Sequence, residues 1–383
     1  MILFFLSLYL TRELGYSIAT AGKVIGAYGL GALLGSYAGG QLVDRYGAHR
    51  IQFLSLLLSG VSLILCGYVR NLELLTICLF VQSALSDAFR PANLSAIIEA
   101  CPSEVRARGF ALNRLAINLG LSVGPAIGGL LATRNYLYLF YVDGLTCIAA
   151  ALFFLILTRH WQHSVRKVHI SSVNQIGPLR NGFFMALMGF VFLLGVVFYQ
   201  IFTTWPLYLR NQCGFAEDVI GLFITLNAVL IVFLEMPLVR SVEKKSPFNI
   251  MIFGGILLFA GLSILPVSQH MAFILFTVIL WTFGEMMIFP LLSTVVSELA
   301  PEENRGKYMG FFTLAFSVSF VVSPGLGGWI YESYGPTILW SIMGMIGFCV
   351  LAGFHLLKKT YPVKIGNNHL ILPPVPFSME NSG

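Results

Sequence analysis

Long apolar runs, bounded by polar residues or by Gly and Pro, recur along the whole chain. They cover residues 1–10, 19–42, 51–69, 74–98, 107–132 and 137–158, and then 183–209, 217–239, 248–268, 271–298, 306–330 and 336–357. Every run except the first is long enough to cross a bilayer, which takes about 20 apolar residues in a helix. Because lipid offers no water to backbone groups, such runs must form helices. The pattern predicts an all-α polytopic membrane protein.

The runs fall into two groups of six. We expect an N-terminal six-helix bundle over residues 1–158, a polar and basic linker over 159–182, and a C-terminal six-helix bundle over 183–357. The tail over 358–383 contains no further long apolar run, and we expect it to be disordered. The expected organisation is therefore two bundles joined by one linker.

The two groups repeat each other when the sequence is shifted by 199 residues without gaps. The shift aligns Gly, Pro and charged positions: Gly22 with Gly221, Pro91 with Pro290, Glu99 with Glu298, Arg106 with Arg305, Pro125 with Pro324, Gly128 with Gly327 and Gly129 with Gly328. The bundles are therefore predicted to be parallel copies of one six-helix unit. Such repeats, with the substrate site between them near the middle of the membrane, are typical of transporters.

The same repeat indicates that the first helix is truncated. The seventh helix starts near position 183, so its counterpart would start about 16 residues before Met1. Ten apolar residues are too few to span a bilayer. We therefore expect upstream apolar residues that complete this helix.

The composition narrows the class of protein further. Hydrophobic residues make up 57% and charged residues 10% of the chain, whereas soluble domains carry roughly 25% charged residues. This excludes a soluble enzyme, a nucleic-acid binder and a disordered scaffold, and no nucleotide-binding loop or nucleophile–base pair indicates catalysis. The six cysteines stand singly, and His160, His163 and His169 lack the spacing of a metal site. We expect no metal and no cofactor.

Basic residues are distributed unequally between the two sides of the membrane. Sixteen of the 23 Lys and Arg residues fall on the side of the linker and tail, five fall on the other side, and Arg90 and Arg114 lie inside helices. The positive-inside rule places the linker and the tail in the cytoplasm. The same bias explains the pI of about 9.0 without an acidic partner. We expect a bacterial inner-membrane protein.

A charged, glycine-containing loop connects the second and third predicted helices. It includes Gly40, Asp44, Arg45, Gly47 and Arg50, and it resembles the Gly-x-x-x-Asp-Arg-x-Gly-Arg-Arg loop motif of the major facilitator superfamily. Glycines allow a tight turn, and the charges can lock one conformation and release another. Ala48 stands where the family has a basic residue, so Arg50 is expected to take that role. We assign Glu99 to the same charge cluster; the alternative is an ordinary positive loop.

The fifth predicted helix contains Gly120, Gly124, Pro125, Gly128 and Gly129. This pattern resembles the Gly-x-x-x-Gly-Pro-x-x-Gly-Gly motif that the superfamily associates with antiporters. Glycines at positions i, i+4 and i+8 leave a flat face for close helix packing, and the proline adds a bend. The resemblance covers essentially the whole chain and is strongest to the twelve-helix drug:proton antiporter branch.

Charged residues inside the membrane are costly, so each is a candidate for function. Asp87 and Arg90 share a helix face, where they line a cavity or pair with each other; Arg114 and Asn118 share a face of the next helix. Glu285 falls beside Asp87 when 199 is subtracted, so we expect both carboxyl groups to face one cavity. In a low dielectric a carboxyl group favours its protonated form and can carry a proton. We place Asp143 and Glu235 near helix ends and rank them lower.

Two further candidates, Tyr199 and Gln200, lie in a patch of aromatic and hydrogen-bonding residues before Pro206. Such a patch suits a partly aromatic substrate. The leading hypothesis is a proton-coupled exporter (an antiporter) of small drug-like or metabolite molecules that works by alternating access. The alternatives are a facilitator or symporter of a small metabolite, and a receptor or scaffold that kept the fold. We expect a monomer in a lipid bilayer, with protons as the coupling ion and no nucleic-acid partner.

Overall fold

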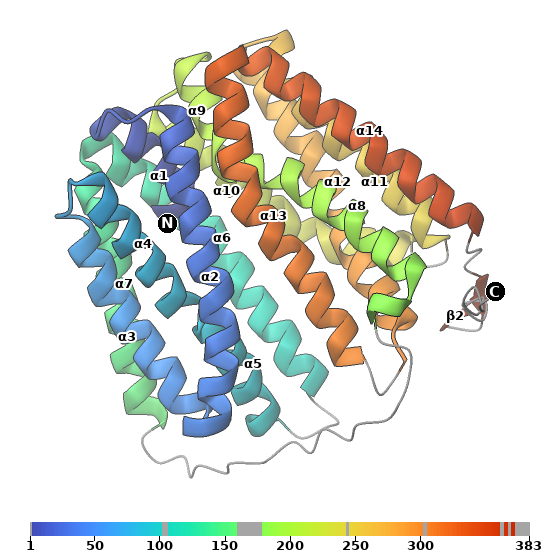
Figure 1. The fold of residues 1–383 in the computed structure, drawn as a ribbon, viewed down its shortest axis with the longest axis horizontal. Helices are drawn as coiled ribbons and strands as arrows, with labels where there is room; N and C mark the ends of the chain where they lie inside the picture. The colour runs from blue at the N-terminus through green and yellow to red at the C-terminus, as the bar shows by residue number, and fades with distance from the viewer. Residues whose placement is uncertain are drawn as a thin grey trace, which may run out of the picture.

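The structure, a computed structural model, describes residues 2–101, 106–158, 178–242, 245–301, 305–360, 364–366 and 369–371. Figure 1 shows the first half of the chain on one side of the molecule and the second half on the other. The helices of the first half are α1 Ile2–Leu8, α2 Ile18–Tyr46, α3 Ala48–Cys66, α4 Leu72–Asp87, α5 Phe89–Ala100, α6 Arg106–Arg134 and α7 Tyr136–Thr158. Those of the second half are α8 Gly182–Phe198, α9 Thr204–Asn211, α10 Glu217–Val242, α11 Pro247–Ser263, α12 Met271–Leu299, α13 Arg305–Tyr334 and α14 Pro336–Thr360.

The apolar runs predicted from the sequence are the helices of the structure. Within the described residues, eleven helical segments are long and apolar enough to cross a membrane. The first run forms only α1 and a π-helical turn, Tyr9–Glu13, and α1 is buried against its neighbours, with Phe5 and Leu6 fully enclosed. The prediction of an all-α membrane protein built from two six-helix bundles is confirmed.

Two of the predicted runs are interrupted next to a proline. The run over 74–98 is divided at Ala88 into α4 and α5, and the run over 183–209 is divided at the 3-10 turn Tyr199–Phe202 into α8 and α9. A proline has no N–H to donate to the carbonyl four residues earlier. Pro91 therefore leaves the Asp87 carbonyl without its helical partner, and Pro206 does the same for Phe202. Pro290, the repeat counterpart of Pro91, lies within the unbroken α12.

The two halves meet at one end of the molecule through two equivalent helix pairs. In the first pair, α2 with α13, a Cβ on Gly22 would overlap the carbonyl of Pro324. In the second pair, α10 with α6, a Cβ on Gly221 would overlap the carbonyl of Pro125. Because 199 residues separate Gly22 from Gly221 and Pro125 from Pro324, the contacts are related by the repeat. We call this end, with Gly22, Gly221, Pro125 and Pro324, the closed end.

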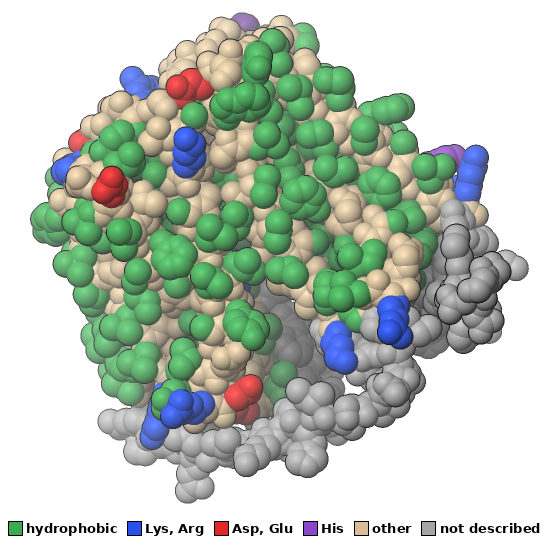
Figure 2. Space-filling view, viewed as in Figure 1, with side chains coloured by type: hydrophobic (Ala, Val, Ile, Leu, Met, Phe, Trp, Pro, Cys, Tyr) green, Lys and Arg blue, Asp and Glu red, His purple; other side chains and the backbone are tan. Residues whose placement is uncertain are grey.

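The helices α2 and α13 separate toward the other end of the molecule. Figure 1 shows α2 and α13 side by side at the closed end and diverging away from it. Between their diverging parts lies a groove of about 630 Å³, visible as a hollow in Figure 2. We call this the open end; it carries the α2–α3 turn at Gly47. In this conformation the two halves are therefore joined at one end and apart at the other.

The connecting and terminal segments are described only in part. Residues 159–177 of the expected linker, with its three histidines, lie outside the described residues, and Pro178–Arg180 form a 3-10 turn. In the tail, α14 continues to Thr360, and strand β1, Lys364–Gly366, pairs antiparallel with β2, His369–Ile371. The other residues of the tail lie outside the described residues, so the expected disorder of the tail stays a prediction.

Candidate functional site: a cavity between the two halves

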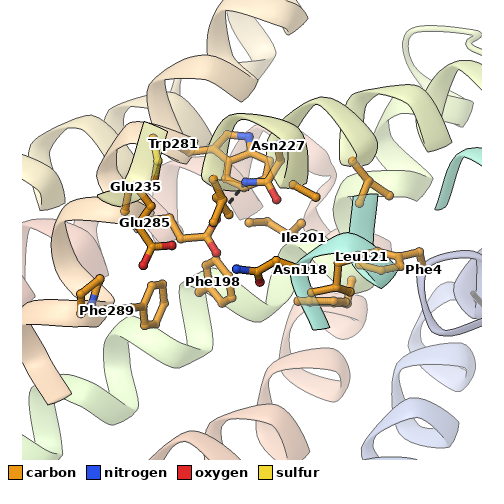
Figure 3. A pocket seen from close by; sticks show the side chains of 16 residues that line it. Phe4, Asn118, Leu121, Phe198, Ile201, Asn227, Glu235, Trp281, Glu285 and Phe289 are labelled. Carbon is orange, nitrogen blue, oxygen red and sulfur yellow. Dashed lines mark hydrogen bonds between the residues drawn. The ribbon is translucent and has the colours of Figure 1, made fainter. Parts of the chain in front are cut away.

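An enclosed cavity of about 180 Å³ lies between the two halves (Figure 3). Its walls are Phe198, Ile201 and Phe202 from the α8–α9 region, Ile224, Asn227, Ala228, Ile231 and Glu235 from α10, and Trp281, Glu285, Met286, Phe289 and Pro290 from α12. The first half closes it with Phe4 from α1 and with Asn118 and Leu121 from α6. Most of the wall is apolar or aromatic, so the few polar groups in it must orient any ligand.

The acidic group of Glu285 is held by a neutral amide. Asn227 Nδ2, on α10, donates to Glu285 Oε2 over 2.9 Å and to Thr282 Oγ1 over 3.0 Å. The Thr282 hydroxyl in turn donates to the Val278 carbonyl over 2.6 Å. No Lys, Arg or His is present among the described residues that line this cavity. Glu285 is thus positioned by hydrogen bonds on the cavity wall.

The cavity contains Asn227, which was not among the predicted site residues, and Glu235, which was ranked below them. Glu235 was ranked low because of its position near a helix end, yet it lines the cavity and is only 7% exposed. Asn227, Ile231 and Glu235 are four residues apart, which places them along one face of α10. That spacing was available in the sequence, but nothing in it indicated which face of α10 meets the cavity.

Asp87 is not on the wall of the Glu285 cavity, and it pairs with Arg90 across the break between α4 and α5. Arg90 Nε lies 2.6 Å from Asp87 Oδ1, with the Asp87 side chain 13% exposed and that of Arg90 76% exposed. Tyr199 of the second half lies within electrostatic range of both charges, and its ring packs against Phe320. The mutual ion pair, which we considered as the alternative, is the arrangement found. Asp87, Arg90 and Tyr199 are not among the cavity-lining residues.

Gln200 is a packing residue inside the second half. It is fully buried, and its amide Nε2 donates to the Ser323 carbonyl over 3.0 Å and to Ser323 Oγ over 2.9 Å. Its Oε1 accepts from the Thr204 hydroxyl over 2.7 Å. Gln200 therefore bridges two helices and does not face the cavity. Arg114 lies on α6, and its side chain is outside the part that the structure describes.

The loop motif lies at the open end. Gly47, at a φ of +85°, forms the turn between α2 and α3. Asp44, Arg45 and Arg50 are exposed, and Gly40 meets open space. Arg45 lies over the ring of Tyr46, 5.3 Å from its centroid.

Glu99 faces a residue of the motif that we had not singled out. Glu99 Oε2 lies 3.9 Å from His49 Nδ1, and His49 is otherwise packed near the ring of Phe154. Among the described side chains, Asp44, Arg45 and Arg50 form no ion pair while the halves are apart at this end.

Part of the helix-five motif, Pro125 and Gly129, lies in the contact between the halves. A Cβ on Gly129 would overlap the backbone of Glu217 and Asp218, and Gly128 packs against Phe5. Pro125 is buried, whereas Gly124 is partly exposed and Gly120 meets open space. Gly129 therefore allows α6 to approach α10 at the closed end, as Gly328 allows α13 to approach Ile18 of α2, whereas Gly128 packs within the first half.

Two repeated helical halves, a cavity between them and a joined end opposite an open one define a membrane transporter of the alternating-access class. The sequence model of the Major Facilitator Superfamily matches residues 1–315 and 283–378. The chain therefore belongs to this superfamily and is a secondary transporter in a lipid bilayer. Proteins of this kind are not enzymes.

Relatives and solved structures agree with this assignment. The chain is 26% identical over 379 residues to the MFS-type transporter YqjV of Bacillus subtilis, covering 93% of this chain and 88% of the relative. It is 21% identical to a Na⁺, Li⁺, K⁺/H⁺ antiporter of Planococcus maritimus, covering 93% and 92%. It is 25% identical to the multidrug resistance protein MdtH of Proteus mirabilis, covering 91% and 88%. The crystal structure of the nucleoside transporter NupG superposes with a TM-score of 0.80 at 13% identity, covering 93% of this chain and 95% of that one.

Proposed function

We propose that this protein is a proton-coupled exporter of small drug-like or metabolite molecules, with the cavity around Glu285 as the shared site of proton and substrate. The single observation that carries the proposal is the position of Glu285: a carboxyl group on the wall of a largely apolar cavity, held by the neutral Asn227. A carboxyl group in such surroundings can take up and release a proton. The names of two relatives, an antiporter and a multidrug resistance protein, support proton-coupled export as the function.

The proposed cycle uses the two ends of the molecule. With the open end toward the cytoplasm, as the distribution of Lys and Arg favours, a substrate reaches the cavity from the cytoplasm and displaces the proton of Glu285. The halves then join at the open end and separate at the closed end, so the substrate leaves and a proton enters. Glu285 is deprotonated only while substrate is bound, and this competition couples proton flow to substrate flow. In this proposal the transporter works as a monomer in a bacterial inner membrane.

The proposal is tested in proteoliposomes with an acidic interior and a panel of dyes, drugs and metabolites. An antiporter accumulates its substrate inside as protons leave, whereas a symporter accumulates it when the interior is alkaline. A facilitator equilibrates its substrate regardless of pH. Accumulation driven only by an alkaline interior, or unaffected by any pH gradient, would refute the antiport assignment.

The role of Glu285 is tested with the substrate found in that panel. We expect Glu285→Gln to keep substrate binding and downhill exchange and to lose accumulation driven by the pH gradient. The matched variant is Glu235→Gln, which changes the second carboxyl group of the same cavity and should retain pH-driven accumulation. If Glu285→Gln accumulates substrate as well as the unmodified protein does, the proton site lies elsewhere.

A further inference from the structure

The groove between α2 and α13 is a second concave site, separate from the cavity around Glu285. It is larger, about 630 Å³ against about 180 Å³. Its walls are Leu33, Ser36 and Tyr37 from α2, Pro178 and Leu179 from the turn before α8, and Lys307, Gly310, Phe311, Thr313, Leu314 and Ser317 from α13. Among these described lining residues, Lys307 is the only charged one. The groove thus combines an apolar wall, several hydroxyl groups and a single positive charge.

The groove-lining residues of α13 run from the start of its membrane-spanning segment, at Lys307, toward the middle of that segment. Lys307 is exposed in the first turns of α13, where the membrane-spanning segment Lys307–Tyr334 begins. Gly310, Leu314 and Ser317 follow about one, two and three turns deeper. Tyr37 is 70% and Leu314 is 41% exposed, and the hollow between the halves is open on the side of the molecule that Figure 2 shows. Its charged group therefore stands at the headgroup level and its apolar wall at the level of the acyl chains.

We propose that an anionic phospholipid of the surrounding bilayer occupies this groove, with its headgroup on Lys307 and one acyl chain along Gly310, Leu314 and Ser317. Basic pockets between transmembrane helices suit anionic headgroups. The N-terminal end of α13, which carries the partial positive charge of the helix dipole, adds to the attraction. The acyl chain covers apolar surface that would otherwise face the gap between the halves.

The occupied groove has a consequence for the transport cycle. The groove exists because α2 and α13 are apart at the open end, and it disappears when the halves join there. A ligand that binds only one of two states shifts the population toward that state. An anionic phospholipid in the groove therefore favours the conformation seen here. This inference concerns neither the substrate nor the coupling ion. Only the placement of the bound lipid in the cytoplasmic leaflet rests on the orientation proposed above.

The test uses the whole protein in nanodiscs that contain phosphatidylglycerol with a photoactivatable group near the end of one acyl chain. Crosslinks, mapped by mass spectrometry, should concentrate on residues 33–37 of α2 and 310–317 of α13. We expect Lys307→Ala to reduce this labelling several-fold, whereas Lys359→Ala, which removes an exposed lysine at the end of α14, leaves it unchanged. The corresponding phosphatidylcholine probe should label these segments weakly.

A second pair of variants tests the groove without changing charge. A Cβ on Gly310 meets open space, so Gly310→Leu fills the groove without a clash and should abolish the labelling. Gly189, exposed on α8, also meets open space, and Gly189→Leu should have no effect. Equal labelling in both glycine variants, or in both lysine variants, would overturn the proposal. So would equal labelling by the phosphatidylcholine probe, or competition by water-soluble glycerol phosphate as strong as that by the unlabelled lipid.

The effect on conformation is measured with spin labels on Gln41→Cys and Ser241→Cys, which are exposed near the open end on the two halves and do not line the groove. Phosphatidylglycerol should increase the fraction of molecules with the longer label-to-label distance, compared with phosphatidylcholine alone. The same addition should have no effect in the Lys307→Ala background. An identical distance distribution in both lipids would show that bound lipid does not favour the open end.

Discussion

At the scale of single residues, the two membrane carboxyl groups that the repeat places side by side have different surroundings. Asp87 forms an ion pair with Arg90 at 2.6 Å, whereas Glu285 accepts a hydrogen bond from the neutral Asn227. The difference follows from the neighbours: Arg90 is three residues after Asp87, and the corresponding position after Glu285 is Ile288. Neighbouring positions in the repeat therefore do not carry equivalent chemistry.

This difference predicts opposite results for two conservative substitutions. Because Asp87 is outside the cavity, Asp87→Asn should leave substrate affinity within about twofold of the unmodified protein and keep pH-driven accumulation. Glu285→Gln, by contrast, should abolish that accumulation. Equilibrium binding and proteoliposome uptake measure the two properties separately. A large loss of affinity in Asp87→Asn would place the substrate against the Asp87–Arg90 pair instead.

A single hydroxyl group also links the two halves at the closed end. Tyr136 of α7 donates to Glu217 Oε1 of α10 over 2.9 Å, and Arg210 Nε lies 3.5 Å from the same oxygen. Tyr136→Phe removes only the bond that crosses between the halves. Because a hydrogen bond to a charged group contributes about 1.5–3 kcal/mol, we expect a shift of roughly tenfold or more toward the state with the closed end apart.

The shift is measured as the distance between spin labels on Lys23→Cys and Ser333→Cys, both exposed at the closed end. Tyr138→Phe, which changes an exposed tyrosine of the same helix, is the control. Identical distance distributions in the two variants would show that the Tyr136 hydroxyl does not hold the halves together.

At the scale of elements, the closed end depends on how near two pairs of helices can approach. Gly22 faces the Pro324 carbonyl, and Gly221 faces that of Pro125. Because both carbonyls are backbone atoms, neither can move aside without shifting a helix. The absence of a side chain at two positions is therefore what allows the two halves to join.

Gly22→Ala and Gly221→Ala should therefore have the same effect, an increased distance between the Lys23→Cys and Ser333→Cys labels and slower transport. The matched control is Gly325→Ala, next to Pro324, because a Cβ there meets open space. If Gly22→Ala behaves like Gly325→Ala, α2 and α13 do not form the closed end in the working transporter. A response of only one of the two variants would show that the halves do not move as repeats.

At the scale of the whole molecule, the two ends differ in the groups that can join the halves there. The closed end is a close packing of helices, whereas the open end carries a loop whose Asp44, Arg45 and Arg50 are exposed. Charges that are unengaged in one state are available to pair in the other. We therefore expect the loop to hold the open end shut in the alternate conformation.

Asp44→Asn tests this expectation. It should impair transport strongly, leave expression and folding intact, and increase the fraction of molecules with the open end apart, as measured with the Gln41→Cys and Ser241→Cys labels. Because Asp44 makes no ion pair among the described side chains of the present state, the substitution should not destabilise this conformation. Transport at the normal rate would show that the loop does not act as a lock.

The sequence alone determined the class of this protein, its helices and its repeat. These features are local or periodic. A membrane-spanning helix follows from about 20 apolar residues, and the match of Gly22 with Gly221 follows from shifting the sequence by 199 residues. The tertiary structure decided which helix faces meet. Gln200 turns inward to Ser323, and Asn227 and Glu235 line the cavity. These outcomes depend on packing between helices that are distant in the sequence, and hydropathy in a membrane-spanning run does not distinguish a face toward lipid from a face toward the cavity.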